Sequence, residues 1–509
     1  MNLDELEKMQ QQKKIADKNT FKTMSELKGH LRTVGEEWRV EHTTENTNTG
    51  KIKVLPVTPR AVADILKKYC HFILINEDNP ELAPLAVYDY DSGIYNKGER
   101  FINQLILSVE RTLNAANCKT IIHYLTVECE EKEPTKDRNL IIVNNGVYNR
   151  SKQAIEPFNP RYVFVNKIAT NYVKNAKEPT FPDWNFSNWI KELSDGNASK
   201  ERLLWQIFAI AINSNYISEV AVFFLSEEGR TGKSTFQDLL ISLVGRQNTT
   251  SLKIREFEKD FKLASTYGSS LVVGDDNNSK DFNETSENFK SVVTGETVLI
   301  NPKGKEPFTT RLTPFVVQSM NGIARFKDVS DGLLRRLRIV RFNHSYKGEK
   351  NNRRIKEEYI HDRALLEFIL SKVINLQFDE VEDTAESQQI IGEIRRDNDA
   401  VYSFYEDVFP ELQSERLPMK FIFELFRAWS DSENNPTKMK QRTFTKEIKT
   451  IAERDEWNYS RNNLAPLKFF AHIDKEYFDS LDQGYKYNAN IDSERKQPLL
   501  WRKSNKATT

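Results

Sequence analysis

The chain has 509 residues, which by the usual size of domains is enough for about three of them. Hydrophobic residues make up 38% and charged residues 29%, a composition typical of a soluble globular protein. Its 74 basic residues balance 74 acidic residues, so only a local patch can attract nucleic acid. The longest apolar stretch, 203–212, is too short to span a bilayer, and no signal segment opens the chain. We therefore expect a cytoplasmic protein without membrane contact.

The cysteines do not indicate a metal or disulfide framework. Cys70, Cys118 and Cys129 are scattered and form no C-x-x-C pair. We expect them to be small, buried apolar residues.

The first part of the chain changes from a polar segment to a patterned one. Residues 1–52 are rich in Lys, Glu, Gln, Thr and Asn, which predicts a flexible extension. Residues 53–179 are predicted to form a small α/β domain, with helices over 59–66 and 100–113 and a hairpin over 85–95. Residues 180–215 are predicted to form a helical lead-in.

A second α/β unit is predicted over 216–376, including a charged connector over 347–362 and a helix over 364–376. The acidic, Gln-containing stretch 377–400 predicts a solvated linker. Residues 401–509 alternate amphipathic helices with turns. The predicted fold class is therefore α/β, with a helical domain at the C-terminal end.

A phosphate-binding loop is the most specific pattern in the chain. An apolar run over 220–225 precedes the sequence GRTGKST, and an apolar segment follows it, which gives the order strand, loop and helix. Loop glycines let the backbone wrap around a triphosphate, while N–H groups face its oxygens. Lys233 can reach the β/γ phosphates and Ser234 can bind Mg²⁺. We predict nucleotide binding by Gly229, Arg230, Thr231, Gly232, Lys233, Ser234 and Thr235.

The loop departs from the usual pattern at one position. The pattern has glycine five positions before Gly232, where this chain has Glu227, followed by Glu228. Two carboxylates beside a phosphate site are compatible with it only if they point outward.

A pair of acids completes the predicted site. The apolar segment 270–274 ends at Asp275 and Asp276. We expect its strand to lie beside the strand of the loop, with Asp275 holding Mg²⁺ through water and Asp276 polarising the attacking water. In many such sites the second acid is Glu, which is longer than Asp276. An acidic turn that merely closes a strand is the alternative.

Residues 313–322 predict another short buried strand closed by a polar turn, which contains Ser319 and Asn321. The side-chain amide of Asn321 can sense the γ-phosphate or hold the attacking water. A buried strand and turn without any part in chemistry is the alternative.

Arg335 and Arg336 precede the last apolar strand, over 337–342. A guanidinium is always charged and planar, so it suits the developing charge on a phosphoryl group, here in the site of a neighbouring subunit. A solvated basic edge is the alternative.

Residues 298–308 predict a hairpin with Lys303 and Lys305 at its tip. In a ring, such tips line the pore and contact a phosphate backbone without reading its sequence. Lys-Gly-Lys is also an ordinary exposed turn.

The C-terminal segment predicts helices beginning at 401, 419 and 439, which suggest a winged-helix module. We expect the third helix to enter a major groove of DNA, with a solvated helix face as the alternative. Its predicted DNA contacts are Lys438, Lys440, Arg442, Lys446 and Lys449.

Taken in order, the phosphate loop, the acid pair, the lysine hairpin, Asn321 and the arginine pair resemble the superfamily 3 helicases, ring-forming AAA+ motors of viruses, phages and plasmids. Residues 144–215 look like the segment that precedes the motor in phage and poxvirus primase-helicases. Residues 55–460 resemble the replication initiators of staphylococcal pathogenicity islands and similar mobile elements. The resemblance implies an AAA+ P-loop motor, a homo-hexamer, ATP with Mg²⁺, and unwinding of duplex DNA. Arg336 stands where the family has its arginine finger, with Arg335 as the alternative.

The sequence also allows functions other than that of a helicase. Asp89 and Asp91 have the acid-x-acid form of a two-metal primase site, but Ser92 and Gly93 make a hairpin turn equally natural, and no third acid or histidine partner is evident. We therefore expect no primase activity. A AAA+ regulator or remodeller of protein partners and an origin-binding scaffold that does not hydrolyse ATP are the remaining alternatives.

Overall fold

The computed structural model describes residues 21–45, 52–76, 83–277, 286–303, 306–322, 330–348, 352–455, 457–466, 474–482 and 496–502. The chain forms two compact units, which divide near residue 388. In the described part of the chain, none of the helices combines the length and the apolar character needed to cross a membrane.

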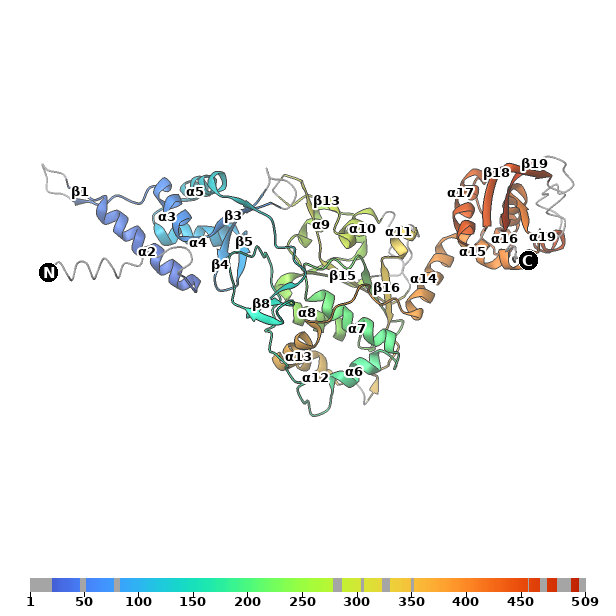
Figure 1. Ribbon diagram of the computed structural model, residues 1–509, viewed down its shortest axis with the longest axis horizontal. Helices are drawn as coiled ribbons and strands as arrows, with labels where there is room; N and C mark the ends of the chain where they lie inside the picture. The colour runs from blue at the N-terminus through green and yellow to red at the C-terminus, as the bar shows by residue number, and fades with distance from the viewer. Residues whose placement is uncertain are drawn as a thin grey trace. The chain divides into compact units, whose positions relative to one another are not determined.

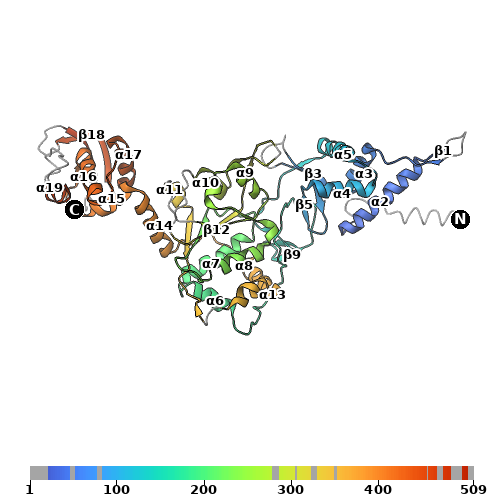
Figure 2. The same cartoon turned by 180° about the vertical axis from the view of Figure 1, so that it is seen from behind.

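The first unit opens with helices packed on a small mixed sheet. The helices are α2 (Met24–Glu41), α3 (Pro59–Tyr69), α4 (Glu99–Val109) and α5 (Ala115–Glu128). The sheet has the order β5-β4-β3-β6 and consists of β3 (Phe72–Ile75), β4 (Leu85–Asp89), β5 (Ile94–Asn96) and β6 (Glu131–Lys132). A short antiparallel ladder joins β1 (Thr44–Glu45) to β2 (Ile52–Lys53). Figures 1 and 2 show α2, α3 and α4 side by side, and β4 and β5 are the predicted hairpin.

Helix α2 corrects the expectation of a flexible extension over residues 1–52. Its side chains at Met24, Leu27 and Leu31 are buried in the core shared with α3 and α4. The apolar residues recur at spacings of three and four, which is the pattern of one helix face, but the polar composition of the segment outweighed that signal in the prediction. They are Met24, Leu27, Leu31, Val34 and Trp38. Residues 1–20, which belong to the same prediction, lie outside the described residues.

A five-stranded parallel sheet forms the second part of this unit. Its order is β11-β12-β15-β10-β16, and its strands are β10 (Ala221–Leu225), β11 (Thr249–Ser251), β12 (Leu271–Asn277), β15 (Phe315–Met320) and β16 (Leu337–Arg341). The chain therefore has the predicted mixed α/β character with a parallel sheet. The carboxyl ends of parallel strands meet at one edge, so the segments that follow β10, β12 and β15 converge there.

Helices cover both faces of the parallel sheet. Successive side chains of a strand point to opposite faces. Phe224 therefore packs on Phe236 of α8 (Lys233–Val244), with 5.4 Å between ring centroids, while Phe223 packs on Phe289 of α10 (Glu287–Thr294) at 6.2 Å. Figure 1 shows α8 with α7 (Ala198–Ala211) and α13 (Arg363–Val373) on one side of the sheet, and α9 (Asp260–Leu263) with α10 on the other.

The remaining elements of this unit include a second small sheet. This antiparallel sheet, β7 (Leu140–Val143), β8 (Gly146–Asn149) and β9 (Ala154–Glu156), shares the core of the parallel sheet through Ile141, Val143 and Tyr148. That core therefore begins well before the boundary expected at residue 179. The other elements are α6 (Phe186–Leu193), β13 (Thr297–Ile300), β14 (Phe308–Arg311), α11 (Asp331–Leu334) and α12 (Arg353–Glu357), with 3₁₀ turns at Arg246–Asn248, Ile254–Glu256, Ala264–Thr266 and Tyr359–His361.

The stretch 377–400 differs from the predicted solvated linker. Helix α14 (Ala385–Asn398) occupies most of it and buries Ile390 and Ile394, which are four residues apart on one helix face. Before the helix, Glu382 accepts a hydrogen bond from Ser199 of α7 at 2.6 Å. The acidic and glutamine residues that suggested a linker include exposed positions of this helix.

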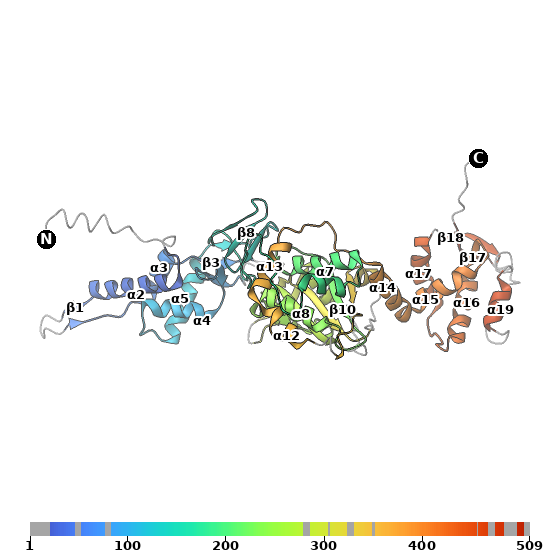
Figure 3. The ribbon, with the colours of Figure 1, turned by 90° about the horizontal axis from the view of Figure 1, so that it is seen from below.

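The second unit combines helices with a three-stranded antiparallel sheet. The helices are α15 (Ala400–Val408), α16 (Met419–Ser432), α17 (Gln441–Ala452) and α19 (Lys475–Asp482), with 3₁₀ turns at Phe409–Glu411 and Glu453–Asp455. The strands are β17 (Arg416–Pro418), β18 (Trp457–Pro466) and β19 (Lys496–Arg502), in the order β17-β19-β18. Phe404, Phe426 and Phe444 join α15, α16 and α17 in one core. Figure 3 shows these helices from below, and they correspond to the three predicted helices.

The buried carboxylate of Glu110 holds α2 to the rest of its core. It accepts hydrogen bonds from Val57 N and Arg39 Nη1, each at 3.0 Å, and its side chain is 2% exposed. Burial favours the neutral acid, but these bonds and those from Thr112 outweigh burial and lower the pKa to about 2. A carboxyl whose pKa is lower in the folded state stabilises the fold above its unfolded pKa and loses that contribution as the pH falls through its folded pKa.

We expect Glu110→Gln to reduce the local stability of α2 at pH 7 by about 1–3 kcal/mol, because a charge-assisted network is lost. The wild-type helix should lose the same contribution between about pH 4.5 and pH 2, a dependence that the variant lacks. Hydrogen exchange of peptide 24–41, corrected for intrinsic rates, measures both effects. Glu36→Gln, at an exposed position of the same helix, is the control. Equal protection in the two variants would contradict the role of Glu110.

Candidate functional site

The segment between β10 and α8, which the sequence predicts to be a phosphate loop, ends in a glycine that caps the helix. Gly232 directly precedes α8 and adopts a φ of +86°, a left-handed conformation that favours glycine. A Cβ at Gly232 would lie 3.1 Å from Leu193 Cδ2 and 3.3 Å from Tyr346 Cε2. A Cβ at Gly229 would meet no protein atom within 4 Å. The backbone conformation therefore favours glycine at position 232, and a Cβ there would also need Leu193 and Tyr346 to shift slightly.

A cavity of about 640 Å³ lies over this loop. Residues 228–235 line it together with Asp275 from β12 and Asn321 from the turn after β15. The volume falls within the range of roughly 300–1,000 Å³ that is usual for small-molecule sites. The parallel sheet thus brings together the predicted loop, the first predicted acid and the predicted amide.

Lys233 connects the loop to the end of β15. Its side chain is buried, and its ammonium donates to Met320 O at 2.9 Å and to Asn321 Oδ1. A buried ammonium is costly unless acceptors surround it, so these oxygens fix its position at the carboxyl edge of the sheet.

A buried polar network places Asp275 at the same edge. Asn277 donates to Gln318 Oε1 at 2.9 Å and to Ser319 O at 3.1 Å. A Cβ at Gly274 would lie 1.9 Å from Gln318 Oε1, so a larger residue there would displace that amide from its hydrogen bonds. Between Gly274 and Asn277 the register of β12 against β15 shifts, and Asp275 lies in this irregularity. Such bulges re-aim side chains, and here Asp275 lines the cavity.

The two glutamates before the loop are each paired with a cation. Glu227 accepts from Arg341 Nη2 at 2.6 Å, and Glu228 accepts from Lys347 Nζ at 2.6 Å. Lys347 also lowers the pKa of the Glu228 carboxyl. These cations neutralise the two carboxylates, so Glu227 and Glu228 need not repel a phosphate bound at the loop.

The outer wall of the cavity was not predicted from the sequence. It includes residues from the predicted helical lead-in, from the charged connector and from the position just before that connector, namely Trp189, Tyr346, Asn352, Arg353, Ile355, Lys356 and Glu357. Tyr346 N donates to Arg230 O at 2.9 Å, and Lys356 Nζ donates to Ser234 Oγ at 3.3 Å. No spacing in the sequence relates these residues to the loop. The two tryptophans, Trp184 and Trp189, are the one feature of the sequence that could have indicated a packed wall here.

The arginine pair lies at the opposite edge of the sheet. Arg336 immediately precedes β16, where Leu337 is in register with Ala221, the first residue of β10. The phosphate loop follows Leu225, the last residue of that strand. Arg335 is exposed, Arg336 Nη1 donates to Gly332 O, and neither lines the cavity. The structure therefore does not bring the arginines to the loop of their own chain.

Two predicted residues lie partly or wholly outside the described structure. The Asp276 side chain and Lys305 are not among the described positions. Lys303 is exposed in the turn that follows β13, and β13 and β14 form the predicted antiparallel hairpin.

The acid-x-acid pair in the first sheet takes part in turns. Asp89 accepts from Ser92 Oγ at 2.6 Å and from Asp91 N at 3.0 Å, and Asp91 accepts from Met24 N at 3.0 Å. Within the described residues, no group of three or more His, Cys, Asp or Glu side chains is arranged to hold a metal ion.

The basic residues predicted to contact DNA lie around α17. Phe444 and Ile448 bury one face of the helix, which leaves the opposite face in solvent. Lys449 is half-buried and pairs with Glu453 at 3.7 Å. The four exposed members of the predicted set are Lys438, Lys440, Arg442 and Lys446.

Three family models match parts of the chain. Residues 12–194 match a model described as D5 N terminal like, residues 396–490 match one described as Poxvirus D5 protein-like, and residues 224–336 match a family of unknown function, DUF5906. The D5-like matches support a D5-like primase-helicase superfamily and a DNA-replication function of the helicase or primase type.

Solved structures of the NrS-1 C-terminal region are also similar to this chain. The A-form apo structure has 15% sequence identity and a TM-score of 0.47, with 80% of this chain and 97% of that chain covered. Another apo structure of the region has 15% identity, the same coverage and a TM-score of 0.45.

We expect Gly232→Ala to lower the stability of the nucleotide-free protein by about 1–3 kcal/mol, because alanine is strained at this φ and its Cβ approaches Leu193. Gly229→Ala, in the same loop, should stay within about 0.5 kcal/mol, because no protein atom lies near its Cβ. Thermal unfolding without nucleotide compares the variants. Indistinguishable unfolding curves would contradict this packing of the loop.

Proposed function

We propose that this D5-like chain is an ATP-dependent DNA helicase that initiates replication of a mobile genetic element and works as a homo-hexameric ring. The observation that carries the proposal is the single cavity lined by the phosphate loop with Lys233, Asp275 and Asn321. Loop, carboxylate and amide are the parts that phosphoryl transfer needs for binding, metal placement and sensing.

ATP and Mg²⁺ are the proposed cofactors of this cavity. The N–H groups of the loop and the N-terminus of α8 suit a triphosphate, and the oxygens of Ser234 and Asp275 suit Mg²⁺. Bound ATP with Mg²⁺ supplies the phosphoanhydride that is cleaved. With ATP bound, Lys233 would donate to phosphate oxygens in place of Asn321 Oδ1, and the Asn321 amide would then be available to orient a water. Asp276 is the proposed group that polarises that water.

Arg336 is proposed to act in the site of a neighbouring subunit. The five residues of β10 separate its edge of the sheet from the loop by roughly 13–17 Å at about 3.3 Å per residue. An arginine side chain at that edge is better placed for a subunit that faces the edge than for its own loop. A ring supplies such a neighbour on every subunit.

DNA is proposed to contact two places on the chain. Lys303 and Lys305, at the hairpin between β13 and β14, are proposed to follow a phosphate backbone in the pore. The exposed face of α17, within a proposed winged-helix module, is proposed to recognise the origin through its basic residues. These two contacts separate translocation from sequence recognition.

The first test is Lys233→Ala, for which we expect ATP hydrolysis and unwinding of forked DNA to fall at least about 10²-fold. Lys191→Ala, at an exposed position of α6, is the charge-matched control and should retain both activities. Wild-type hydrolysis without unwinding would favour a remodeller of protein partners, and neither activity would favour a scaffold. Near-normal hydrolysis by Lys233→Ala would reject this site.

The second test mixes inactive subunits. Arg336→Ala and Lys233→Ala should each be inactive alone, yet mixed rings should regain part of the ATPase activity, because some interfaces then pair an intact loop with an intact arginine. Mixing Arg335→Ala with Lys233→Ala identifies which arginine acts. Confirmed mixed rings without any rescue would contradict action between subunits.

The third test addresses origin recognition. Arg442→Ala should weaken binding to the origin relative to random duplex by about 5- to 150-fold, the effect of losing a base contact worth about 1–3 kcal/mol. Competition binding at fixed salt measures the ratio, since phosphate contacts weaken steeply with salt. Lys475→Ala, at an exposed position in the same unit, is the control. An unchanged ratio in Arg442→Ala would count against recognition by this residue.

A further inference from the structure

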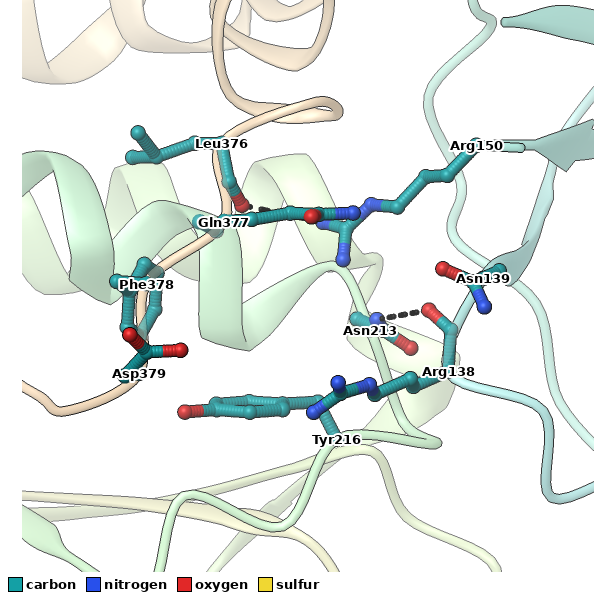
Figure 4. Close-up of a pocket in the computed structure, with 10 residues that line it drawn as sticks. Arg138, Asn139, Arg150, Asn213, Tyr216, Leu376, Gln377, Phe378 and Asp379 are labelled. Carbon is teal, nitrogen blue, oxygen red and sulfur yellow. Dashed lines mark hydrogen bonds between the residues drawn. The ribbon is translucent and has the colours of Figure 1, made fainter. Parts of the chain in front are cut away.

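A second cavity, of about 210 Å³, has no role in the proposed reaction. It forms where the segments flanking β7 and β8 meet the turn after α7 and the segment after α13, as Figure 4 shows. Its volume is below the roughly 300 Å³ at which small-molecule sites usually begin, so it suits a small group and not a whole nucleotide. The residues that decide its chemistry are Arg138, Arg150, Tyr216 and Asp379.

Arg150 is a rigidly held cation on one side of this cavity. Its Nε donates to Ile374 O at 2.6 Å, and its Nη2 donates to Leu376 O at 3.5 Å. A guanidinium has five N–H donors, so these two bonds fix its plane and leave donors for another acceptor. Figure 4 shows its side chain extending from the end of β8 toward Leu376 and Gln377. Burial is the main cause that lowers the pKa of Arg150, and Arg138 lowers it further.

Arg138 supplies a second cation to the same space. Its main-chain oxygen accepts from Asn213 Nδ2 at 3.0 Å, which fixes its backbone against the end of α7. Figure 4 shows its side chain and that of Tyr216 lining the same cavity. Among the described residues, no carboxylate forms an ion pair with either arginine. Two like charges that converge on one polar cavity without a paired carboxylate favour an anionic ligand.

Asp379 is a negatively charged residue in the same cavity, so it opposes the positive charge of the two arginines. It lines the cavity but forms no described ion pair with the arginines. Burial raises the pKa of the Tyr216 hydroxyl, and Asp379 raises it while Arg138 and Arg150 lower it. Tyr216 is therefore influenced by the two arginines and by Asp379. Its hydroxyl remains a neutral hydrogen-bond donor near pH 7.

We propose that this cavity binds a phosphate group between Arg138 and Arg150. The planar donors of the two guanidinium groups match the oxygens of a phosphate, and the small volume suits a single phosphate group. The phosphate can be a phosphodiester of a nucleic acid or can belong to a free phosphate or small phosphorylated molecule. The proposal is independent of ATP hydrolysis at the phosphate loop.

Titration calorimetry of the full chain with inorganic phosphate, at saturating ADP and Mg²⁺, tests the site. Arg138→Ala should weaken phosphate binding at least about tenfold, because one of two charged donors is lost. Asp379→Asn should strengthen binding, because it removes the repelling carboxylate while keeping the size of the side chain. A merely structural role for these exposed residues would not give opposite effects. Arg111→Ala, at an exposed position outside the cavity, is the charge control.

Arg150 is left unchanged in this test, because its bonds to Ile374 and Leu376 hold the chain after α13. The same variants are then compared for binding of a single-stranded DNA oligonucleotide at fixed salt. A parallel loss of phosphate and DNA binding in Arg138→Ala identifies a phosphodiester as the ligand, and loss of phosphate binding alone identifies a free phosphate or small phosphorylated molecule. Equal phosphate binding by the wild type, Arg138→Ala and Asp379→Asn, or no saturable binding, would overturn the proposal.

Discussion

The buried ammonium of Lys233 is the constraint on which the geometry of the candidate site depends. A charge with so little exposure requires acceptors, and the end of β15 supplies them through Met320 O and the Asn321 amide. Together with the ladder that pairs β10 with β15, these bonds hold the end of β15 against the loop. The amides of Asn277 and Gln318 then hold β12 on the other side of β15, so Asp275 reaches the same edge. Each step depends on hydrogen bonds that a buried polar group cannot forgo.

The direction of the strands divides the chemistry of the sheet between two edges. Parallel strands place the loop, the acid and the amide at their carboxyl ends. Arg335 and Arg336 come before β16 and are therefore at the amino ends, whatever the conformation of their side chains. This separation follows from the connectivity of the chain and cannot be removed by a local rearrangement.

The sequence predicted those parts of the site that a strand end and a loop define locally. Lys233, Asp275 and Asn321 each follow an apolar run, so parallel packing alone brings them together. The cavity wall was missed because Trp189 on α6, Tyr346 after β16 and Lys356 on α12 reach the loop only through tertiary packing, which leaves no fixed spacing in the sequence. Two segments with polar compositions were predicted to be a flexible extension and a linker, although the spacing of their apolar residues indicates helices. Helices α2 and α14 have polar compositions, yet Leu27 with Leu31 and Ile390 with Ile394 mark their buried faces. The sequence could not reveal the ion pairs of Glu227 and Glu228, because their partners are more than 100 residues away in the chain. Arg341 is the last residue of β16, and Lys347 follows that strand.

Strand β16 links two features that lie at opposite ends of the sheet. Arg336 lies immediately before it, and Arg341 at its other end holds Glu227 beside the loop. The chain continues from there to Tyr346, whose N–H binds the loop at Arg230 O. Strand β16 pairs with β10 along its length, so both of its ends belong to one hydrogen-bonded ladder. The fold thus connects Arg336 to the rim of the cavity through a single strand of five residues.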